Sequence, residues 1–331
     1  MNKKRIVSGI QATGNVHIGN YLGAIRHWVN MQKDYECFYF LADLHAITID
    51  QNPESLRSAI YNTTAALIAS GIDTSAVTLF AQSSVKEHTE LAWMLNCVTP
   101  IGWLKRMTQF KDKAGKDQES ASCGLFSYPV LMSADILLYE ADIVPVGEDQ
   151  KQHIELTRDI AGAINRKFGK EVLRTPEPLI QGSTIRVKSL KDGTKKMSKS
   201  DPSDLSRINL SDSKDDIISK IKKAKTDSFE YISYEASRPE ISNLLEIFSA
   251  FSEIPIEFLV SQYAGAGFAK FKSDLADIVA SKLSPINTKY NEIKDNHTYL
   301  NEILTKGKEK AVVRALKTIG KLKEEFGFLN L

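Results

Sequence analysis

Residues 8–24, SGIQATGNVHIGNYLGA, combine residue types suited to binding a phosphate group. The segment follows a short apolar run, turns through Gly14 and Gly19, and enters a helical pattern from about Asn20. Glycine lets the backbone approach a ligand closely, and the start of a helix offers free N–H groups to phosphate. The imidazole of His17 can bond a phosphate oxygen there, although histidine is equally common as a structural residue. The segment therefore predicts a phosphate site and leaves the role of His17 open.

This glycine loop matches neither of the common nucleotide-binding motifs. No Gly-Lys-Ser or Gly-Lys-Thr ends it, so it is not a P-loop. It also lacks the G-x-G-x-x-G fingerprint, although Asp43 ends the next apolar run, where dinucleotide-binding proteins place a ribose-binding acid. The missing fingerprint argues against an oxidoreductase.

A second segment, KKMSKS at residues 195–200, carries three lysines and two serines and is called the KMSKS arm below. Turn formers flank it, KDGT at residues 191–194 and Asp201-Pro202, so we expect a surface loop. Such a cationic loop suits phosphate charge, but most basic loops are simply solvated. The glycine loop that accompanies the arm favours the phosphate interpretation.

Alternating elements must position these two segments. Residues 5–10, 37–43, 77–81 and 143–146 are predicted strands, and helical patterns lie between them or, at about residues 149–168, after the last. This alternation predicts an α/β fold with a doubly wound parallel sheet, whose ligand lies beyond the carboxyl ends of the strands. After about residue 206 the pattern is mostly helical. Residues 306–323 carry seven basic residues and one acid, which predicts either a solvated face or a polyanion contact.

The composition is that of an ordinary globular chain. Among 331 residues, 43 Lys and Arg balance 41 Asp and Glu, and 42% of residues are hydrophobic, which excludes a disordered chain. The near-neutral charge argues against a protein wrapped in nucleic acid but allows a local basic face. Three widely spaced cysteines argue against a metal knuckle or disulfide framework and favour a cytoplasmic setting. No signal peptide or membrane span is expected.

HIGN at residues 17–20 and KMSKS at residues 196–200 resemble the two signature motifs of class I aminoacyl-tRNA synthetases. Ala12 stands where the family usually has proline, and Asn20 replaces a second histidine, as is normal in the tryptophan branch. The resemblance covers essentially the whole chain. Five further segments resemble the bacterial-type tryptophanyl-tRNA synthetase family in particular. They are SGIQ-x-TG at the start, ADLHAIT at 42–48, RMTQFKDK at 106–113, YPVLMSADILLY at 128–139 and VPVGEDQKQHIELTRD at 144–159.

The resemblance implies activation of L-tryptophan by ATP, followed by transfer to the 3′-terminal ribose of tRNA(Trp). The attacking carboxylate is already ionised, so the reaction needs cations and N–H donors rather than a general base. By resemblance Lys196 and Lys199 escort the pyrophosphate, and Lys113 assists, with Lys111 left open as its alternative. Mg²⁺ accompanies ATP and is held mainly by its phosphates, and no protein-ligated metal is expected.

The resemblance also places a set of residues around ATP. Asp149 follows the strand at 143–146, where it either accepts from ribose hydroxyls or caps a helix. The backbone of Val187 matches a position that contacts adenine. The full set is Gln11, Ala12, Thr13, His17, Gly19, Asn20, Gly147, Glu148, Asp149, Val187, Lys196, Met197, Ser198, Lys199 and Ser200.

Selection of tryptophan needs a buried acceptor, because the indole N–H can only donate a hydrogen bond. Asp135 is a candidate, because it lies in an apolar run and shares a helix face with Tyr128 and Met132 at spacing i, i+4, i+7. An isolated acid in such a helix otherwise pairs with Arg or Lys in the core. Ser127 and Pro129 suit the first turn of this helix.

The resemblance assigns each of these side chains a part in binding tryptophan. Asp135 takes the indole N–H, while Tyr128 and Gln150 take the α-amino group. His45 and Val7 are expected to line the pocket with Met132.

The resemblance divides the chain into two domains. Residues 1–205 form a Rossmann-like catalytic domain with a helical insertion and the KMSKS arm. Residues 206–331 form a helical domain that binds the tRNA anticodon, with its last helix packing back on the catalytic domain. Family members are homodimers, and the apolar stretch 91–104 is either an interface or core.

Three other functions stay open at this point. A tyrosyl-tRNA synthetase shares fold and mechanism, but its usual arm and GGSDQ-like loop differ from the KMSKS and GEDQ of this chain. A small-substrate nucleotidyltransferase rarely carries a second helical domain of this length. A non-catalytic paralogue that senses tryptophan or binds RNA is expected to lose lysines of the arm, and all of them are present.

Overall fold

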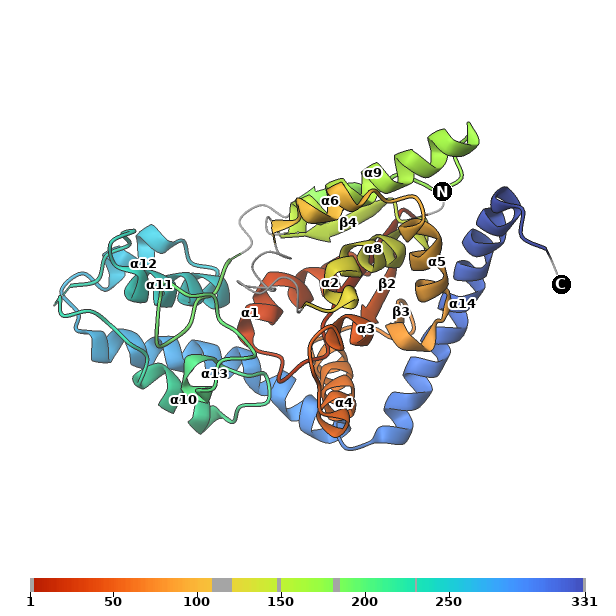
Figure 1. Ribbon diagram of the computed structural model, residues 1–331. Coiled ribbons are helices and arrows are strands. Elements are labelled where there is room, and N and C mark those ends of the chain that lie inside the picture. The colour runs from red at the N-terminus through yellow and green to blue at the C-terminus, as the bar shows by residue number, and fades with distance from the viewer. Residues whose placement is uncertain (1–2, 109–120, 148–149, 181–184, 230, 330–331) are drawn as a thin grey trace.

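The computed structural model describes residues 3–108, 121–147, 150–180, 185–229 and 231–329, and a parallel β-sheet lies at its centre (Figure 1). The strand order is β3-β2-β1-β4-β5, and every neighbouring pair is parallel. The predicted α/β class with a doubly wound parallel sheet is confirmed. The strands are β1 (Arg5–Ile10), β2 (Glu36–Leu41), β3 (Thr78–Ala81), β4 (Ile143–Val146) and β5 (Glu177–Ile180).

Four strands match the sequence prediction to within two residues, whereas β5 is missing from it. Its sequence, EPLI, contains Pro178, which cannot donate a hydrogen bond to a neighbouring strand. β5 lies at the edge of the sheet, where one side of the strand has no partner strand. Proline is tolerated there, so Pro178 is compatible with a strand at this position.

Helices connect the strands and make up most of the second half of the chain. The first half contains α1 (Ile18–Asn20), a π-helical turn (Tyr21–Ile25), α2 (Arg26–Met31), α3 (Asp43–Ala46), α4 (Pro53–Ala69), a 3-10 turn (Gln82–Ser84), α5 (Glu87–Asn96), α6 (Ile101–Lys105), α8 (Cys123–Leu137) and α9 (Lys151–Phe168). The second half contains a 3-10 turn (Asp204–Ser206), α10 (Lys214–Lys222), α11 (Pro239–Ser252), α12 (Ile256–Gln262), α13 (Phe268–Ile293) and α14 (His297–Phe326). No helix of the described residues is long and apolar enough to span a membrane.

Each face of the sheet carries its own hydrophobic cluster, because successive side chains of a strand point to opposite faces. Ile6 and Tyr39 belong to a cluster that includes α2, α4 and the helices α10 to α13. Val7 and Phe38 belong to the other cluster, with α5, α8, α9 and α14. Both faces are thus covered, which explains why the strands are almost continuously apolar.

The helix α8 begins one turn earlier than the sequence suggested. Ser122 caps it by accepting from the backbone N–H of Leu125, so Ser127 and Pro129 lie inside the helix rather than in its first turn. The ring of Pro129 removes one helical donor, and the hydroxyl of Ser133 donates to the Pro129 carbonyl at 2.9 Å. The prediction was wrong because Ser127 and Pro129 are residue types typical of a first helical turn, whereas the residue that caps the helix is Ser122.

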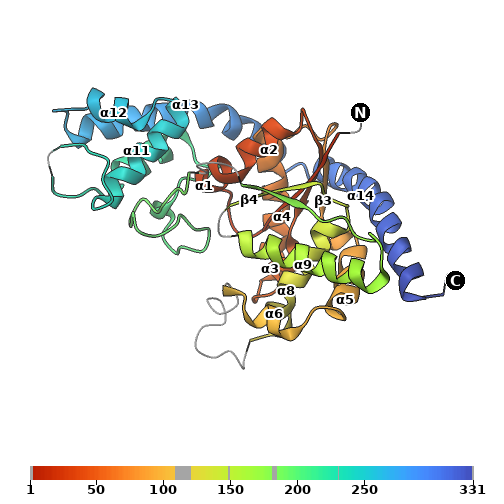
Figure 2. The same cartoon turned by 90° about the horizontal axis from the view of Figure 1, so that it is seen from above.

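The helices α10 to α13 form a lobe beside the sheet, and α14 runs back along the edge strand β3 (Figures 1 and 2). Gly307 of α14 lies against the backbone of Leu79, where a Cβ atom would overlap the Leu79 carbonyl. Backbone-to-backbone contact of this kind requires glycine. The long last helix α14 therefore packs directly against the edge strand β3 of the sheet.

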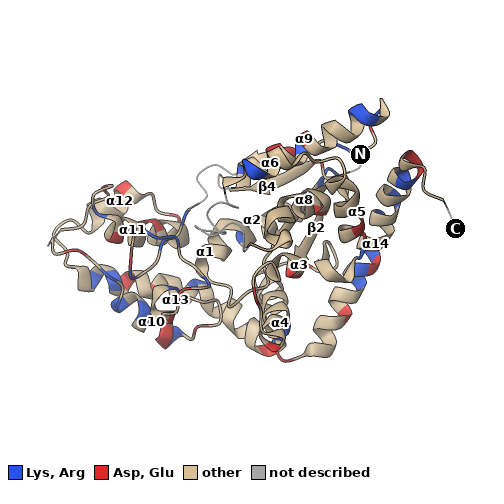
Figure 3. Ribbon diagram, in the orientation of Figure 1, with Lys and Arg blue, Asp and Glu red and all other residues tan. Residues whose placement is uncertain are grey.

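Ion pairs also hold α14 in place, and they use part of the basic run at residues 306–323. Arg314 and Lys321 both pair with Glu140, and Lys323 pairs with Glu90 at 2.7 Å. These three cations pair with carboxylates of the chain itself. A contact between this run and a polyanion would therefore use its other basic residues. Basic positions also lie along α10 and α13 (Figure 3).

Two substitutions on α14 test this packing. We expect Gly307→Ala to destabilise the protein by about 2 kcal/mol or more, because the added methyl group forces the helix away from β3. Gly320→Ala is the matched control, since nothing lies within 4 Å of its Cβ position, and it should stabilise the helix by about 0.8 kcal/mol. Chemical denaturation of both variants measures the difference. Equal stabilities would contradict the close approach of α14 to β3.

Candidate active site

The two loops predicted to bind ATP leave the sheet on either side of its topological switch point. β1 lies between β2 and β4, so the connections after β1 and β4 diverge at the carboxyl ends of the strands, where sheets of this kind bind their ligands. The glycine loop follows β1, and Gly147 follows β4, where its carbonyl accepts from the Gln150 N–H at 2.9 Å. Glu148, Asp149, Lys111 and Lys113 lie outside the described residues.

His17 is buried and caps the helix that starts the HIGN motif. Its Nδ1 accepts from the backbone N–H of Gly19 at 3.1 Å, and its own backbone N–H donates to the side chain of Asn20. Burial lowers the pKa of His17 to about 3, with the nearby charges of Lys199 and Arg207 acting in the same direction. The imidazole is therefore neutral, and because Nδ1 accepts, the ring proton is on Nε2. His17 thus keeps an N–H donor while serving as a structural cap.

Gly19 permits close contact with this imidazole, and Gly14 permits close contact with Lys199 of the arm. A Cβ at Gly19 would lie 2.9 Å from the Cε1 of His17 and 3.7 Å from the Cβ of Val187, so Gly19 lies close to both residues. Gly14 has a φ of +58°, a conformation that favours glycine, and its Cβ position is 3.4 Å from the Cβ of Lys199. Ala12, where the family pattern has proline, is fully buried.

Backbone hydrogen bonds join the glycine loop to the segment that follows the KMSKS arm, although about 190 residues separate them in sequence. The Ile18 N–H donates to the Ile208 carbonyl at 2.9 Å, and the Leu210 N–H donates to the Val16 carbonyl at 2.9 Å. Within the arm, the Lys199 ammonium donates to the Gln11 carbonyl at 3.0 Å. Two predicted phosphate-binding segments are thus brought to one site.

Other arm residues differ in their exposure. Met197 is buried in the core and donates its N–H to the Val187 carbonyl at 3.1 Å, while Lys196 is exposed. The hydroxyls of Ser198 and Ser200 lie 2.9 Å apart. Burial lowers the pKa of the half-buried Lys199 to about 8, so this ammonium titrates close to neutral pH.

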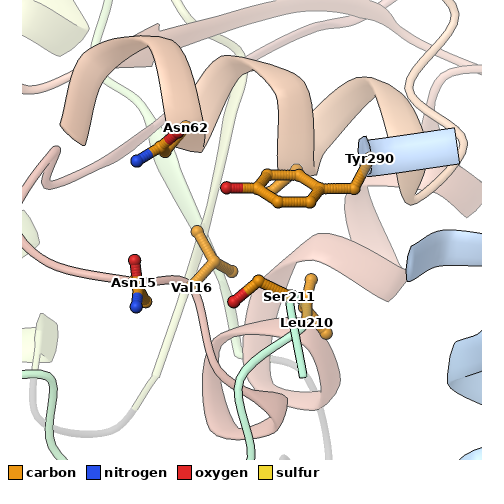
Figure 4. A pocket seen from close by; sticks show the side chains of 7 residues that line it. Asn15, Val16, Asn62, Leu210, Ser211 and Tyr290 are labelled. Carbon is orange, nitrogen blue, oxygen red and sulfur yellow. The ribbon is translucent and has the colours of Figure 1, made fainter. Parts of the chain in front are cut away.

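A cavity of about 10 Å³ lies where the glycine loop meets the helical lobe (Figure 4). The hydroxyl of Tyr290 points into it from α13, opposite Asn62 of α4. This volume is close to that of a single water molecule and cannot hold a nucleotide. The cavity therefore belongs to the joint between lobe and sheet, not to the substrate site.

Asp135 lies at the centre of a buried polar network at the carboxyl ends of β2 and β3. It is 1% exposed, and three side chains contact its carboxylate: His45 Nε2 at 2.7 Å from Oδ2, and Gln82 Nε2 at 2.7 Å and His88 Nδ1 at 2.6 Å from Oδ1. His88 Nε2 lies 2.7 Å from the Tyr139 hydroxyl, a phenol that burial keeps protonated by raising its pKa. His88 therefore accepts from Tyr139 and donates to Asp135.

Within the part of the chain that the structure describes, the network holds Asp135 as a carboxylate with one acceptor position that has no partner. Burial alone would raise the pKa of Asp135, but hydrogen bonds from His45 and His88 outweigh it and lower this pKa. A carboxylate has about four acceptor positions, two on each oxygen. Gln82 and His88 occupy those of Oδ1, and His45 takes one of Oδ2. The position left is on Oδ2, the oxygen beside His45.

Gln82 and His88 are site residues that the sequence interpretation missed. Gln82 comes directly after β3, and a polar residue at the carboxyl end of a parallel strand is a usable signal. His88 gives no such signal, because it lies near the start of α5 among other polar residues and not at the end of a strand. The carboxamide of Gln82 is oriented by the Leu44 N–H, which donates to its Oε1 at 3.2 Å.

The remaining predicted tryptophan contacts surround this network to differing extents. The ring of Tyr128 lies edge-on to His45 with centroids 6.2 Å apart, and its hydroxyl is 3.0 Å from His153 Nε2. Burial raises the pKa of Tyr128 to about 12. Val7 is fully buried in the same cluster as α8, Met132 packs against that cluster, and Gln150 is half-buried before α9. Within the described residues, no group of three or more His, Cys, Asp or Glu side chains could hold a metal ion.

A glycine–histidine loop at the switch point of a parallel sheet, joined to a KMSKS arm, defines the catalytic domain of a class I aminoacyl-tRNA synthetase. The family model "tRNA synthetases class I (W and Y)" matches residues 1–284. The chain belongs to this family, which confirms the resemblance seen in the sequence motifs.

Relatives and solved structures agree with this assignment over the whole chain. A tryptophan–tRNA ligase of Rickettsia conorii is 62% identical over 328 residues, covering 99% of each chain. The tryptophanyl-tRNA synthetase structure from Mycoplasma pneumoniae has a TM-score of 0.86 at 36% identity and covers 99% of this chain and 98% of that one. The Campylobacter jejuni enzyme, solved with ADP and tryptophan, has a TM-score of 0.84 at 36% identity, with coverage of 98% and 100%.

The lowered pKa of Lys199 predicts a pH dependence for the use of ATP. As the pH rises through about 8, Lys199 of the free enzyme loses its proton, so kcat/KM for ATP should fall. Lys199→Arg keeps its charge to higher pH and should remove this fall, whatever its absolute rate. Steady-state kinetics between pH 6 and about 10 at saturating amino acid make the comparison. The same fall in both enzymes would assign the titration to another group.

Proposed function

We propose that the protein activates L-tryptophan with ATP to tryptophanyl-adenylate and pyrophosphate, and then transfers tryptophan to the 3′-terminal ribose of tRNA(Trp). The observation that carries the proposal is the junction of the glycine loop with the KMSKS arm, where Lys199 bonds the Gln11 carbonyl. The choice of tryptophan rests on the buried acceptor Asp135 and on the relatives that carry this activity in their names.

In the activation step, a carboxylate oxygen of tryptophan forms a bond to the α-phosphorus of ATP, and the bond to pyrophosphate breaks. His17 contributes its Nε2–H as a neutral donor to a phosphate oxygen. Lys196 and Lys199, with Lys113, neutralise the charge that develops on the leaving pyrophosphate. Mg²⁺ enters with ATP as part of the substrate and is held mainly by the phosphates.

The nucleotide lies across the switch point in this proposal. Gln11, Ala12, Thr13, Gly19 and Asn20 border it on the β1 side. Gly147, Glu148 and Asp149 border it on the β4 side, and the backbone of Val187 contacts adenine, while Met197, Ser198 and Ser200 complete the arm around the phosphates.

Tryptophan is selected by the acceptor position left on Asp135 Oδ2. The indole N–H donates to it, and an amino acid without this donor leaves a buried carboxylate position unpaired. His45, Met132 and Val7 line the apolar pocket. Tyr128 and Gln150 bind the α-amino group.

The helical region after residue 206 binds the anticodon arm of the tRNA, and the protein acts as a homodimer in the cytoplasm. Two large apolar side chains support the dimer, because Trp93 of α5 and Ile101 of α6 are 71% and 63% exposed. The three cysteines are free thiols, which suits a reducing compartment.

The direct test of the activity is ATP–pyrophosphate exchange with tryptophan, with tyrosine and with no amino acid. We expect exchange with tryptophan alone, because only its side chain offers an N–H to Asp135 in an apolar pocket. Exchange with tyrosine would make the protein a tyrosine enzyme. If the protein binds tryptophan but catalyses no exchange, it would be a tryptophan sensor without catalytic activity.

The dimer is tested by charging its apolar surface. Trp93→Glu should convert the protein to monomers in sedimentation velocity, because a charge at the centre of an apolar interface is not compensated. Phe258→Glu is the matched control, since Phe258 is equally exposed on α12 of the helical lobe. A monomeric wild-type protein, or a Trp93→Glu variant that stays dimeric, would contradict the proposed interface.

A further inference from the structure

A hairpin of residues 187–197, called the arm hairpin below, leads into the KMSKS arm and includes its first three residues. The Met197 N–H donates to the Val187 carbonyl at 3.1 Å, and the Ser189 N–H donates to the Lys195 carbonyl at 2.8 Å. These bonds pair the two sides in an antiparallel sense around Lys188 and Lys196. The hairpin carries Val187 and Lys196, and Lys199 follows two residues after it.

One buried side chain of the helical lobe is bonded to this hairpin. Asn243 of α11 is nearly inaccessible, its Oδ1 accepts from the Lys188 N–H at 2.8 Å, and its Nδ2 donates to the Lys188 carbonyl at 3.0 Å. In an antiparallel pair, alternate residues direct their backbone groups away from the partner strand. Lys188 is such a residue between Val187 and Ser189. Asn243 satisfies both of its outward groups, as a neighbouring strand would.

The tip of the hairpin touches the same helix through an independent contact. A Cβ at Gly193 would lie 2.5 Å from the carbonyl carbon and oxygen of Pro239, the first residue of α11. Only glycine fits at this distance. Next to this contact, Lys225 pairs with Glu240 at 2.8 Å, and its N–H donates to the Leu190 carbonyl. The helix α11 therefore holds both the base and the tip of the hairpin.

The arm is thus fixed between two partners. Lys199 and the segment after it are bonded to the glycine loop, and the hairpin before it is bonded to α11. We propose that Asn243 is a positioning residue for the ATP site: its paired bonds to Lys188 set the register of the hairpin on α11. That register places Val187 against the adenine and the arm lysines against the phosphates. The proposal rests on the proposed ATP-dependent function of this site.

The variant Asn243→Ala tests this role by removing both bonds. Lys188 then has two unpaired backbone groups, so the hairpin should loosen from α11. We expect kcat/KM for ATP in pyrophosphate exchange to fall about tenfold or more, mainly through a higher KM for ATP. The dissociation constant for tryptophan, measured without ATP, should change by less than about twofold, because the network around Asp135 is untouched. Amide hydrogen exchange should become faster in residues 187–197.

Two further variants separate positioning from a general loss of stability. Ser242→Ala is the matched control, since this neighbouring buried hydroxyl donates to the Glu235 carbonyl and does not contact the hairpin. It should leave the ATP kinetics nearly unchanged. Gly193→Ala should reproduce the Asn243→Ala signature by pushing the tip away from Pro239, which keeps the proposal testable if Asn243→Ala fails to fold.

The outcomes distinguish this proposal from the proposed function. Unchanged ATP kinetics and unchanged hydrogen exchange in Asn243→Ala would overturn the positioning role. A wild-type protein that shows no pyrophosphate exchange would instead overturn the function, and hydrogen exchange of residues 187–197 would still report whether Asn243 holds the hairpin.

Discussion

The buried carboxylate of Asp135 is the constraint around which the catalytic half is arranged. An ionised group that is 1% exposed is tolerated only when hydrogen bonds replace its lost hydration. His45 after β2, Gln82 after β3 and His88 on α5 supply these bonds, so three elements must converge on α8. Among the described residues, the same arrangement leaves one acceptor position of Oδ2 without a hydrogen-bond partner. If Asp135 reads the indole N–H as proposed, the fold and the selection of the amino acid depend on the same network.

The phosphate side of the site obeys a different rule. Its donors must be held without becoming buried charges, and each is held by backbone contacts. His17 stays neutral because it caps a helix and is buried, which leaves Nε2–H as a donor. Lys199 is bonded to the Gln11 carbonyl, and the arm hairpin is bonded to Asn243. Burial lowers the pKa of Lys199 because it disfavours the charged ammonium, and a nearby negative group would favour that charged form again.

Local patterns in the sequence predicted the strands, the glycine loop, the arm and Asp135, because each depends on neighbouring residues. The partners of Asp135 were only partly predictable, since His45, Gln82 and His88 meet through tertiary packing and not through spacing. The isolated acid was expected to pair with Arg or Lys if it were structural; within the described residues it instead has two histidines and an amide. Likewise β5 was hidden by Pro178, and no local signal links Asn243 to Lys188. The roles given to individual ATP and tryptophan contacts stay predictions.

The most direct test of this account compares the binding of tryptophan with that of its benzothiophene analogue, in which sulfur replaces the indole N–H. Isothermal titration calorimetry on the wild type and on Asp135→Asn gives the preference for the N–H in each protein. The account predicts a preference of about tenfold or more in the wild type, and its near disappearance in the variant, because Asp135 Oδ2 accepts that hydrogen bond. An equal preference in both proteins would contradict the assignment of Asp135 as the group that selects tryptophan.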